Sequence, residues 1–283
     1  MFLLLARFTV KRYDPRQPRD GHGRWTPTPG GESARPGRLG LGDLMPQQPP
    51  SNRREWQATK QRAGEGVARA LDGEYAGISV IVDQPRVHAD VDQLAFTADL
   101  ILPSGRPVGK TAAEFERRDG QLVAEFLLLS LDSDVQGQGF SGRFVGEMEA
   151  WCRESGVAYI GLDAGLSGGG YAWASRGYDW WDEQQALRVL PRLAHQVDEF
   201  TARLARVDPD GEEAERLAEQ VASAQAILDR MRGEQFGSAD YPTPYEVSQA
   251  GRRPGQPSVT APDQWWIGKA ATMGSKWRGV KIP

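Results

Sequence analysis

Residues 123–154, VAEFLLLSLDSDVQGQGFSGRFVGEMEAWCRE, decide the fold of this chain. The segment begins with a mostly apolar stretch, residues 123–129, which predicts a strand. It continues through a glycine-rich run into residues 140–154, where apolar side chains repeat near every 3.6 positions and predict an amphipathic helix. Glycines let the backbone approach a ligand closely, and the first turn of a helix presents unpaired N–H groups. A strand, a glycine turn and a helix in this order therefore predict an anion site.

The sequence on both sides of this segment predicts a sheet. Residues 109–118 and 121–131 predict two strands, because the Asp119-Gly120 pair between them favours a two-residue hairpin turn. Further strands are expected at residues 78–82, 94–102 and 158–162.

Helices are expected before and after this sheet. Residues 53–71 carry apolar side chains at helical spacing. Residues 183–206 and 211–232 are rich in Ala, Leu, Glu and Arg and predict an antiparallel helical hairpin. We expect Pro191 to kink the first of these helices or to delay its start, because proline cannot donate the intrahelical hydrogen bond. Thr243 and Pro244 predict the capped start of a short helix.

The glycine-rich run resembles motif A of the GNAT acetyltransferase superfamily, Gln-x-x-Gly-x-Gly/Ala. Gln136, Gly139 and Ser141 occupy its three signature positions, with Ser141 in place of the usual Gly or Ala. Residues 171–178, which end in a Gly-aromatic pair, resemble the second helix of that family. The resemblance covers roughly residues 74–182. It implies an α+β fold, a mixed and mostly antiparallel sheet flanked by helices, to which this chain adds a C-terminal helical hairpin.

The resemblance also implies a cofactor and its binding residues. The family binds the pyrophosphate of acetyl-CoA on backbone N–H groups of the turn, and the pantetheine arm on the strand before it. The cofactor-binding residues expected here are Leu129, Leu131, Gln136, Gly137, Gln138, Gly139, Phe140, Ser141 and Gly142.

The catalytic residues that the resemblance implies are only partly present. Glu125 and Glu114 are the candidates for the general base that deprotonates an incoming amine. The tyrosine that commonly protonates the leaving thiolate aligns with Trp173, which cannot supply that proton, and Tyr171 would point elsewhere on a helix. The leading hypothesis is an acetyl-CoA-dependent N-acyltransferase acting on an unknown amine. The alternative is a binding or structural protein that keeps the fold without catalysis.

Composition limits the other possibilities. A net charge of −4 argues against a nucleic-acid partner, and a single cysteine, Cys152, fits a reducing and cytoplasmic setting. The three histidines show no spacing of a metal site. The apolar stretch at residues 1–6 is too short to span a membrane and lacks the features of a signal peptide, so it predicts an initial strand or a docking segment.

The chain divides by composition into four expected parts. Residues 1–50 hold eight of the 19 prolines and a net charge of +4, which predicts a disordered basic arm. Residues 51–182 are expected to form the GNAT-like domain, residues 183–235 the helical hairpin, and residues 236–283 an aromatic tail. The three tryptophans of that tail are expected either to close over the core or to pack against another subunit.

The arm also carries a second resemblance. Residues 13–26, with Gln-Pro-Arg-Asp and Gly-Arg-Trp, resemble a motif of actinobacterial phage and prophage head-associated proteins. The non-catalytic alternative is therefore a virion-associated protein that contacts a virion or host protein through this arm. An ADP-ribosyltransferase toxin is disfavoured, because its Arg, Ser-Thr-Ser and Glu-x-Glu set is not found in order.

Overall fold

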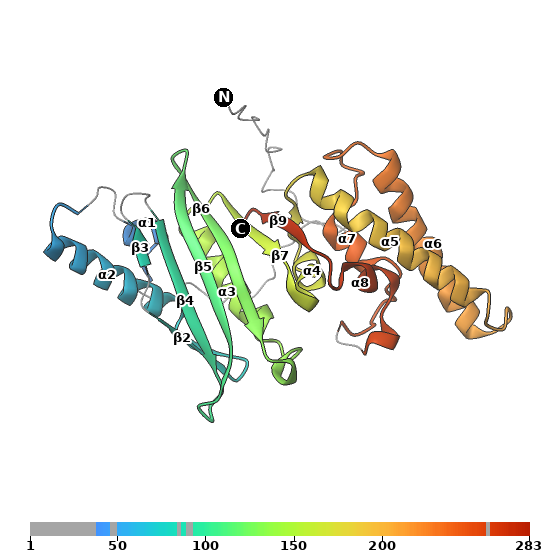
Figure 1. Cartoon of the computed structure of the whole chain (residues 1–283), viewed down its shortest axis with the longest axis horizontal. Helices are drawn as coiled ribbons and strands as arrows, with labels where there is room; N and C mark the ends of the chain where they lie inside the picture. The colour runs from blue at the N-terminus through green and yellow to red at the C-terminus, as the bar shows by residue number, and fades with distance from the viewer. Residues whose placement is uncertain (1–37, 46–49, 84–85, 89–92, 259–260) are drawn as a thin grey trace.

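A computed structural model describes residues 38–45, 50–83, 86–88, 93–258 and 261–283 of the chain (Figure 1). Its strands are β1 (Gly73–Tyr75), β2 (Ile78–Val82), β3 (Arg86–His88), β4 (Gln93–Ile101), β5 (Pro107–Arg118), β6 (Gln121–Leu131), β7 (Tyr159–Ala164), β8 (Asp179–Trp180) and β9 (Trp277–Lys281). Its helices are α1 (Leu41–Leu44), α2 (Arg53–Leu71), η1 (Ser133–Val135), α3 (Phe140–Glu154), α4 (Leu166–Ser175), α5 (Glu183–Leu204), α6 (Glu212–Gly233), α7 (Pro244–Gln249), η2 (Pro262–Gln264) and α8 (Ile267–Thr272).

The strands form one mixed sheet in the order β1-β2-β4-β5-β6-β7-β9-β8, with β3 paired to β4. Among the strand pairs of the described residues, β6–β7 is parallel and the others are antiparallel. Helix α3 lies behind β5 and β6 in the view of Figure 1. The predicted fold class, a mostly antiparallel mixed sheet flanked by helices with an added helical hairpin, is confirmed.

The hairpin of β5 and β6 sets the register of the central sheet. Asp119 and Gly120 have φ angles of 53° and 77°, the left-handed pair that a two-residue type I′ turn requires. The turn pairs Arg118 with Gln121 and, further along, Glu114 with Glu125. The Asp-Gly turn predicted from the sequence is therefore present, and it fixes which residues lie opposite each other.

Helix α3 packs its apolar stripe on the sheet. Its Phe144 ring lies 5.3 Å from the Tyr75 ring, and its Trp151 ring lies 5.6 Å from Phe115 of β5. Cys152 is fully buried on the same helix, as expected for a core residue. The edge-to-face arrangement of both ring pairs is the favourable one for aromatic side chains.

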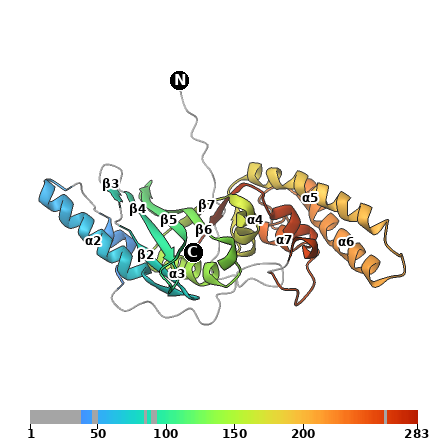
Figure 2. The same ribbon diagram turned by 60° about the horizontal axis from the view of Figure 1, so that its bottom comes forward.

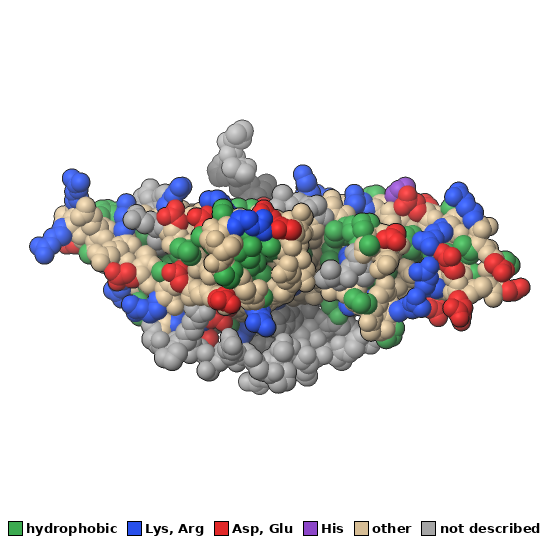
Figure 3. All heavy atoms as spheres, turned by 90° about the horizontal axis from the view of Figure 1, so that it is seen from below, with side chains coloured by type: hydrophobic (Ala, Val, Ile, Leu, Met, Phe, Trp, Pro, Cys, Tyr) green, Lys and Arg blue, Asp and Glu red, His purple; other side chains and the backbone are tan. Residues whose placement is uncertain are grey.

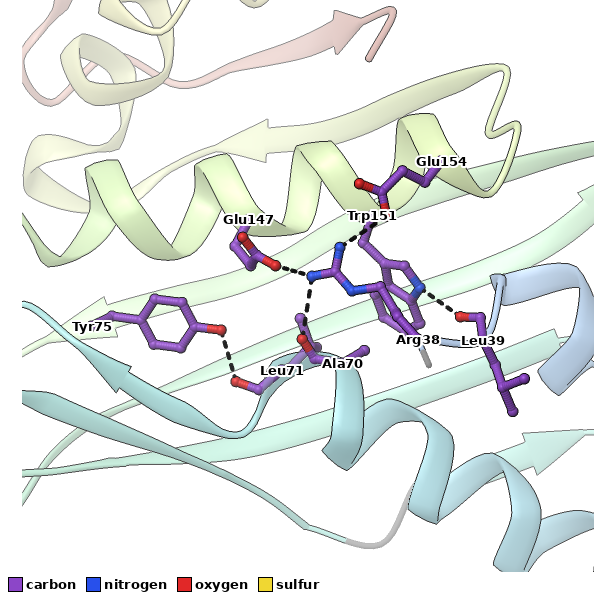
Figure 4. A network of polar contacts seen from close by, with 8 residues as sticks. All are labelled: Arg38, Leu39, Ala70, Leu71, Tyr75, Glu147, Trp151 and Glu154. Atoms are coloured by element: carbon purple, nitrogen blue, oxygen red, sulfur yellow. Dashed lines mark hydrogen bonds and ion pairs between the residues drawn. The ribbon is translucent and has the colours of Figure 1, made fainter. Parts of the chain in front are cut away.

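Residues 38–45, which belong to the segment predicted to be disordered, pack against α2 and α3. The Arg38 guanidinium forms ion pairs with Glu147 and Glu154 of α3, and Trp151 Nε1 donates to the Leu39 carbonyl at 3.0 Å (Figure 4). Leu41 and Leu44 of this segment are buried, so it has apolar surface that stabilises its ordered position. Residues 1–37, with the phage-like motif and the apolar stretch at residues 1–6, lie outside the described residues.

The predicted helical hairpin is formed by α5 and α6, which extend away from the sheet as an antiparallel pair (Figure 2). Helix α5 begins at Glu183 because the Asp182 side chain accepts a hydrogen bond from the Gln185 backbone N–H. The expected delay of this helix by Pro191 is wrong, since α5 starts before Pro191 and continues through it. Charged side chains crowd this end of the molecule (Figure 3), and Glu213 forms ion pairs there.

The C-terminal segment contributes a strand to the same sheet. Strand β9 lies between β7 and β8, and its Trp277 ring packs 5.1 Å from Trp180. Trp266 is also fully buried and donates from Nε1 to the Ser248 carbonyl at 2.6 Å. For these two tryptophans the first alternative, closure over the core, is the one observed. The chain boundaries at residues 50, 182 and 235 stay a prediction.

A buried ion pair holds β9 to α3. Lys281 Nζ lies 2.8 Å from Glu149 Oε2, and the two side chains are 3% and 4% exposed. Arg176, which follows α4, lies 3.5 Å from the other carboxylate oxygen of Glu149. Lys281 also donates to the Arg176 carbonyl at 3.2 Å. The end of β9, the middle of α3 and the end of α4 thus meet at one charged cluster.

Candidate functional site

The central feature of the site is the separation of the two parallel strands. Strands β6 and β7 pair from Val123–Tyr159 to Phe126–Leu162. Beyond this point β6 continues to Leu131 beside β5, whereas β7 ends at Ala164. The carboxyl ends of the two strands therefore leave an opening between them, which is where open sheets with parallel strands bind their ligands.

A β-bulge lies where the separation begins. Ala112 pairs with Leu128 and Ala113 pairs with Phe126, so Leu127 is the extra residue on β6. A bulge bends its strand and increases the local twist. Thr111 Oγ1 donates to the Leu128 carbonyl at 3.0 Å and fixes the strand just past the bulge. The bulge thus turns the end of β6 away from β7.

Strand β6 is followed by the short 3-10 helix η1 and then by the glycine turn that precedes α3. Gly137 and Gly139 have φ angles of 77° and 89°, a conformation that glycine adopts without strain. Gln136 Nε2 donates to the Leu131 carbonyl at 2.7 Å, and Gln138 Nε2 donates to the Asp134 carbonyl at 3.1 Å. Both glutamine side chains therefore hold the shape of the turn.

The N-terminus of α3 is open and free of negative charge. Its N-cap, Gly139, has no side chain to cap the helix, and its first turn holds no acidic residue. In contrast, α2, α5 and α6 all carry a glutamate in the first turn. Arg176 Nη1 lies 3.5 and 3.4 Å from the carbonyl oxygens of Ser141 and Gly142 and adds positive charge nearby. The unpaired N–H groups and this charge favour an anion here.

The two candidate carboxylates lie together on the sheet. Glu114 and Glu125 are direct register partners on β5 and β6. Their neighbours Phe115 and Ala124 face α3, so the alternation of side chains places both glutamates on the opposite face. Glu114 accepts a hydrogen bond from the Gln93 amide. Glu125 lies one residue before the last β6–β7 pair, at the start of the opening.

Glu125 is held by residues that sequence analysis did not identify. Arg278 of β9 donates from Nη2 to its carboxylate at 2.7 Å, and Arg118 lies 4.0 Å away. The carboxylate lies over Gly161 of β7, where a Cβ atom would stand only 2.5 Å from Oε2. Burial raises the pKa of the Glu125 carboxyl, and Arg278 opposes part of this rise. Arg278 reaches Glu125 only because β9 pairs with β7, so no local signal in the sequence could have revealed this contact.

A small apolar pocket lies below the opening, on the α3 side of the sheet. Seven of its lining residues come from β6, α3 and α4: Phe126, Leu128, Leu129, Phe144, Val145, Met148 and Trp173. The Trp173 ring packs 6.3 Å from Phe126. The pocket has a volume of about 10 Å³, which is close to the minimum that holds one water molecule.

The two nearby phenols, Tyr171 and Tyr178, do not line this pocket. The Tyr171 ring packs 5.8 Å from Trp266, and burial raises the pKa of its hydroxyl. Tyr178 is fully buried, and burial raises its pKa well above the usual range. Neither phenol lines the pocket, whereas Trp173 does. The wall of the pocket on the α4 side is therefore formed by an indole and not by a phenol.

The described part of the chain holds no group of three His, Cys, Asp or Glu side chains that could bind a metal ion. His195 is exposed and pairs with Glu199 on α5, far along the chain from the carboxylates. No helix within the described ranges is long and apolar enough to cross a membrane.

Comparison with known proteins gives structural matches only. No family model matches the chain, and no curated protein is significantly similar to it. Similar solved structures include a GNAT family acetyltransferase from Elizabethkingia anophelis with acetyl-CoA bound, with a TM-score of 0.26 and 14% identity over 31% of this chain. They also include an acetyltransferase from Bacillus cereus, with a TM-score of 0.27 and 15% identity over 47% of this chain.

A nourseothricin acetyltransferase matches with a TM-score of 0.27 and 14% identity over 41% of this chain. The match covers 79% of that protein and 82% of the Bacillus protein, but only 56% of the Elizabethkingia protein, about half of its length.

Proposed function

We propose that the chain is an acyl-CoA-dependent N-acyltransferase. One observation carries this proposal: β6 separates from β7 at a bulge and then leads, through the short 3-10 helix η1, into an uncapped glycine turn. From Glu125 to Leu131 the strand covers about 20 Å, at about 3.3 Å per residue. This span is comparable to an extended phosphopantetheine arm, so an arm lying along β6 can reach the carboxylate from the end of the strand.

The turn would hold the pyrophosphate of acetyl-CoA. Backbone N–H groups of residues 138–142 would donate to its oxygens, as helix N-termini do with other phosphates. The pantetheine amides would pair with the β6 backbone at Leu129 and Leu131, in the manner of an added strand. Gln136 and Gln138 would contribute by holding the turn, since their side-chain amides bond the backbone.

Glu125 is the better candidate for the general base. It lies at the start of the opening, and its raised pKa makes it a stronger base than an ordinary carboxylate. It would take a proton from the acceptor ammonium, after which the amine nitrogen attacks the thioester carbonyl. The N–C bond forms, the C–S bond breaks, the thiolate leaves, and the nitrogen loses its remaining extra proton to water. Glu114 is its register partner. The Glu114 carboxylate would attract the positively charged acceptor and so help to hold it near Glu125.

The leaving thiolate would take its proton from water. Trp173 has no acidic group, and both nearby phenols face other parts of the core. General acid catalysis contributes about 10²- to 10⁴-fold to a rate. We therefore expect turnover to be slow compared with that of an enzyme that holds a phenol at this place.

Calorimetric titration of the full chain with acetyl-CoA and with 3′,5′-ADP tests the proposal. Gly142 lies in the first turn of α3, and Gly146 lies one turn further; a side chain at either position has open space. We expect Gly142→Glu to weaken the binding of both ligands at least tenfold, because its carboxylate would repel the phosphates. Gly146→Glu is the matched control and should bind nearly as wild type, since the helix dipole acts mainly within the first turn.

Unchanged affinity of Gly142→Glu would show that the phosphates bind elsewhere. The absence of binding of either ligand to wild type would refute the acyltransferase and favour a non-catalytic protein of the same fold. The indole at Trp173 and the small pocket are the observations that favour this second candidate. A virion or host partner for residues 1–50 and a cytoplasmic setting stay predictions.

A further inference from the structure

Trp173 closes one side of the apolar pocket. Among the described residues that line this pocket, Trp173 alone comes from α4; the others belong to β5, β6 and α3. Residues of β5 and β6 line the pocket from the sheet, and residues of α3 line it from the helix. The indole therefore determines how far the pocket extends toward α4.

The indole is a fixed wall, because it packs between two other rings. Phe126 lies 6.3 Å from it on the side of the pocket, and Tyr178 lies 5.2 Å from it in an edge-to-face arrangement on the other side. Tyr178 is 1% exposed and lies beside the buried cluster of Glu149 and Lys281. Trp173 is itself partly buried, and these two ring contacts restrict the rotation of its indole.

The pocket lies at the place that the reacting end of a bound thioester would reach. Glu125 is on the open face of the sheet, one residue before the strands separate, and the pocket is on the other face at the same point. A thioester carbonyl in the opening would face the acceptor on one side and extend its acyl chain into the pocket on the other. The pocket volume of about 10 Å³ has room for one water-sized group, which is close to the size of a methyl group.

We propose that Trp173 limits the acyl group of the donor to the size of acetyl. This inference rests on the proposed function and adds the donor specificity of the same site. Replacing the indole by a methyl group would open a larger apolar cavity. A cavity of about 150 Å³ lined by apolar side chains binds benzene, so a benzoyl group is a suitable probe for the enlarged pocket.

The experiment compares the dissociation constants of acetyl-CoA, benzoyl-CoA and 3′,5′-ADP for the full chain. For wild type we expect acetyl-CoA to bind at least tenfold more tightly than benzoyl-CoA. For Trp173→Ala we expect this ratio to fall below threefold or to invert, with 3′,5′-ADP binding unchanged. Trp173→Leu makes a smaller cavity and should give an intermediate ratio, and it serves in place of Trp173→Ala if that variant does not fold.

Trp56→Ala is the matched control, because Trp56 is a partly exposed indole on α2 that does not line the pocket. It should keep the wild-type ratio. An unchanged ratio in Trp173→Ala and Trp173→Leu, with 3′,5′-ADP still bound, overturns this inference alone. Failure of wild type and all variants to bind 3′,5′-ADP or either thioester overturns the proposed function together with it.

Discussion

The buried ion pair between Lys281 and Glu149 allows a test of how the last strand is held. Its two charged atoms lie 2.8 Å apart, and both side chains are less than 5% exposed. Replacement of Lys281 by Met removes the cation but keeps most of the apolar stem. Glu149 would then remain buried with Arg176 at 3.5 Å as its nearest cation. The substitution therefore leaves a poorly compensated charge in the core.

The expected loss in the free energy of unfolding follows from this arrangement. Removing one partner of a buried ion pair destabilises a protein by about 3–5 kcal/mol. Because Arg176 still faces Glu149, we expect Lys281→Met to lower the free energy of unfolding by about 3 kcal/mol, at the lower end of that range. For a chain of this size, this corresponds to a fall in Tm of roughly 6–12 °C.

Urea unfolding and calorimetry of a double-mutant cycle measure this effect. The double variant Glu149→Leu/Lys281→Met carries neither charge, and we expect it to be more stable than Lys281→Met alone. Lys276→Met is the control, because Lys276 is exposed just before β9, and it should change stability by less than about 0.5 kcal/mol. A cost below about 1 kcal/mol for Lys281→Met, or a double variant as unstable as the sum of the single ones, would refute the reasoning.

Two further predictions concern Glu125 and the segment at residues 38–45. The folded state holds the Glu125 proton more tightly than the unfolded state, whose pKa is near 4.5, so wild type loses stability as the pH rises through this window. Glu125→Gln should lack this loss. In urea unfolding from pH 4 to 7, the free energy of unfolding of the variant should therefore increase relative to that of wild type. A difference between the two proteins that does not change with pH would contradict the raised pKa. A Cβ atom at Gly66 would clash with the Leu44 side chain. Gly66→Ala should therefore lack the stability of about 0.8 kcal/mol that this substitution usually adds within a helix. It should also speed limited proteolysis at residues 38–49. If the variant is more stable than wild type and is cleaved at the same rate, the packing of Leu44 against Gly66 does not hold this segment in place.

Much of the fold could be predicted because its signals are local. The periodic apolar residues of α2 and α3 mark helices whose observed bounds match the predicted ones. The two-residue turn at Asp119-Gly120 also fixes the register of its hairpin, and counting back from it pairs Glu114 with Glu125. The juxtaposition of the two candidate carboxylates could therefore have been derived from the sequence.

Other features depend on contacts between distant parts of the chain. Strand β9 pairs with β7 more than a hundred residues earlier, so nothing near residues 277–281 indicates its partner. Arg278 reaches Glu125 only through this pairing. Likewise, the bulge at Leu127 is a mismatch between two strands and leaves no mark in either sequence alone. The expectation that Pro191 delays the start of α5 was wrong, because the N-cap at Asp182 starts the helix before the proline.

The position of β9 also determines when the protein can fold during its synthesis. A ribosome adds about 5–20 residues per second, so β9 follows β7 by on the order of 10 s. During this time the nascent chain exposes one edge of β7, a template for pairing with other chains. The base candidate Glu125 has no Arg278, and α3 has no Lys281, until these last residues emerge. A translational pause within residues 165–276 would prolong the period in which the half-made sheet can aggregate or recruit a chaperone.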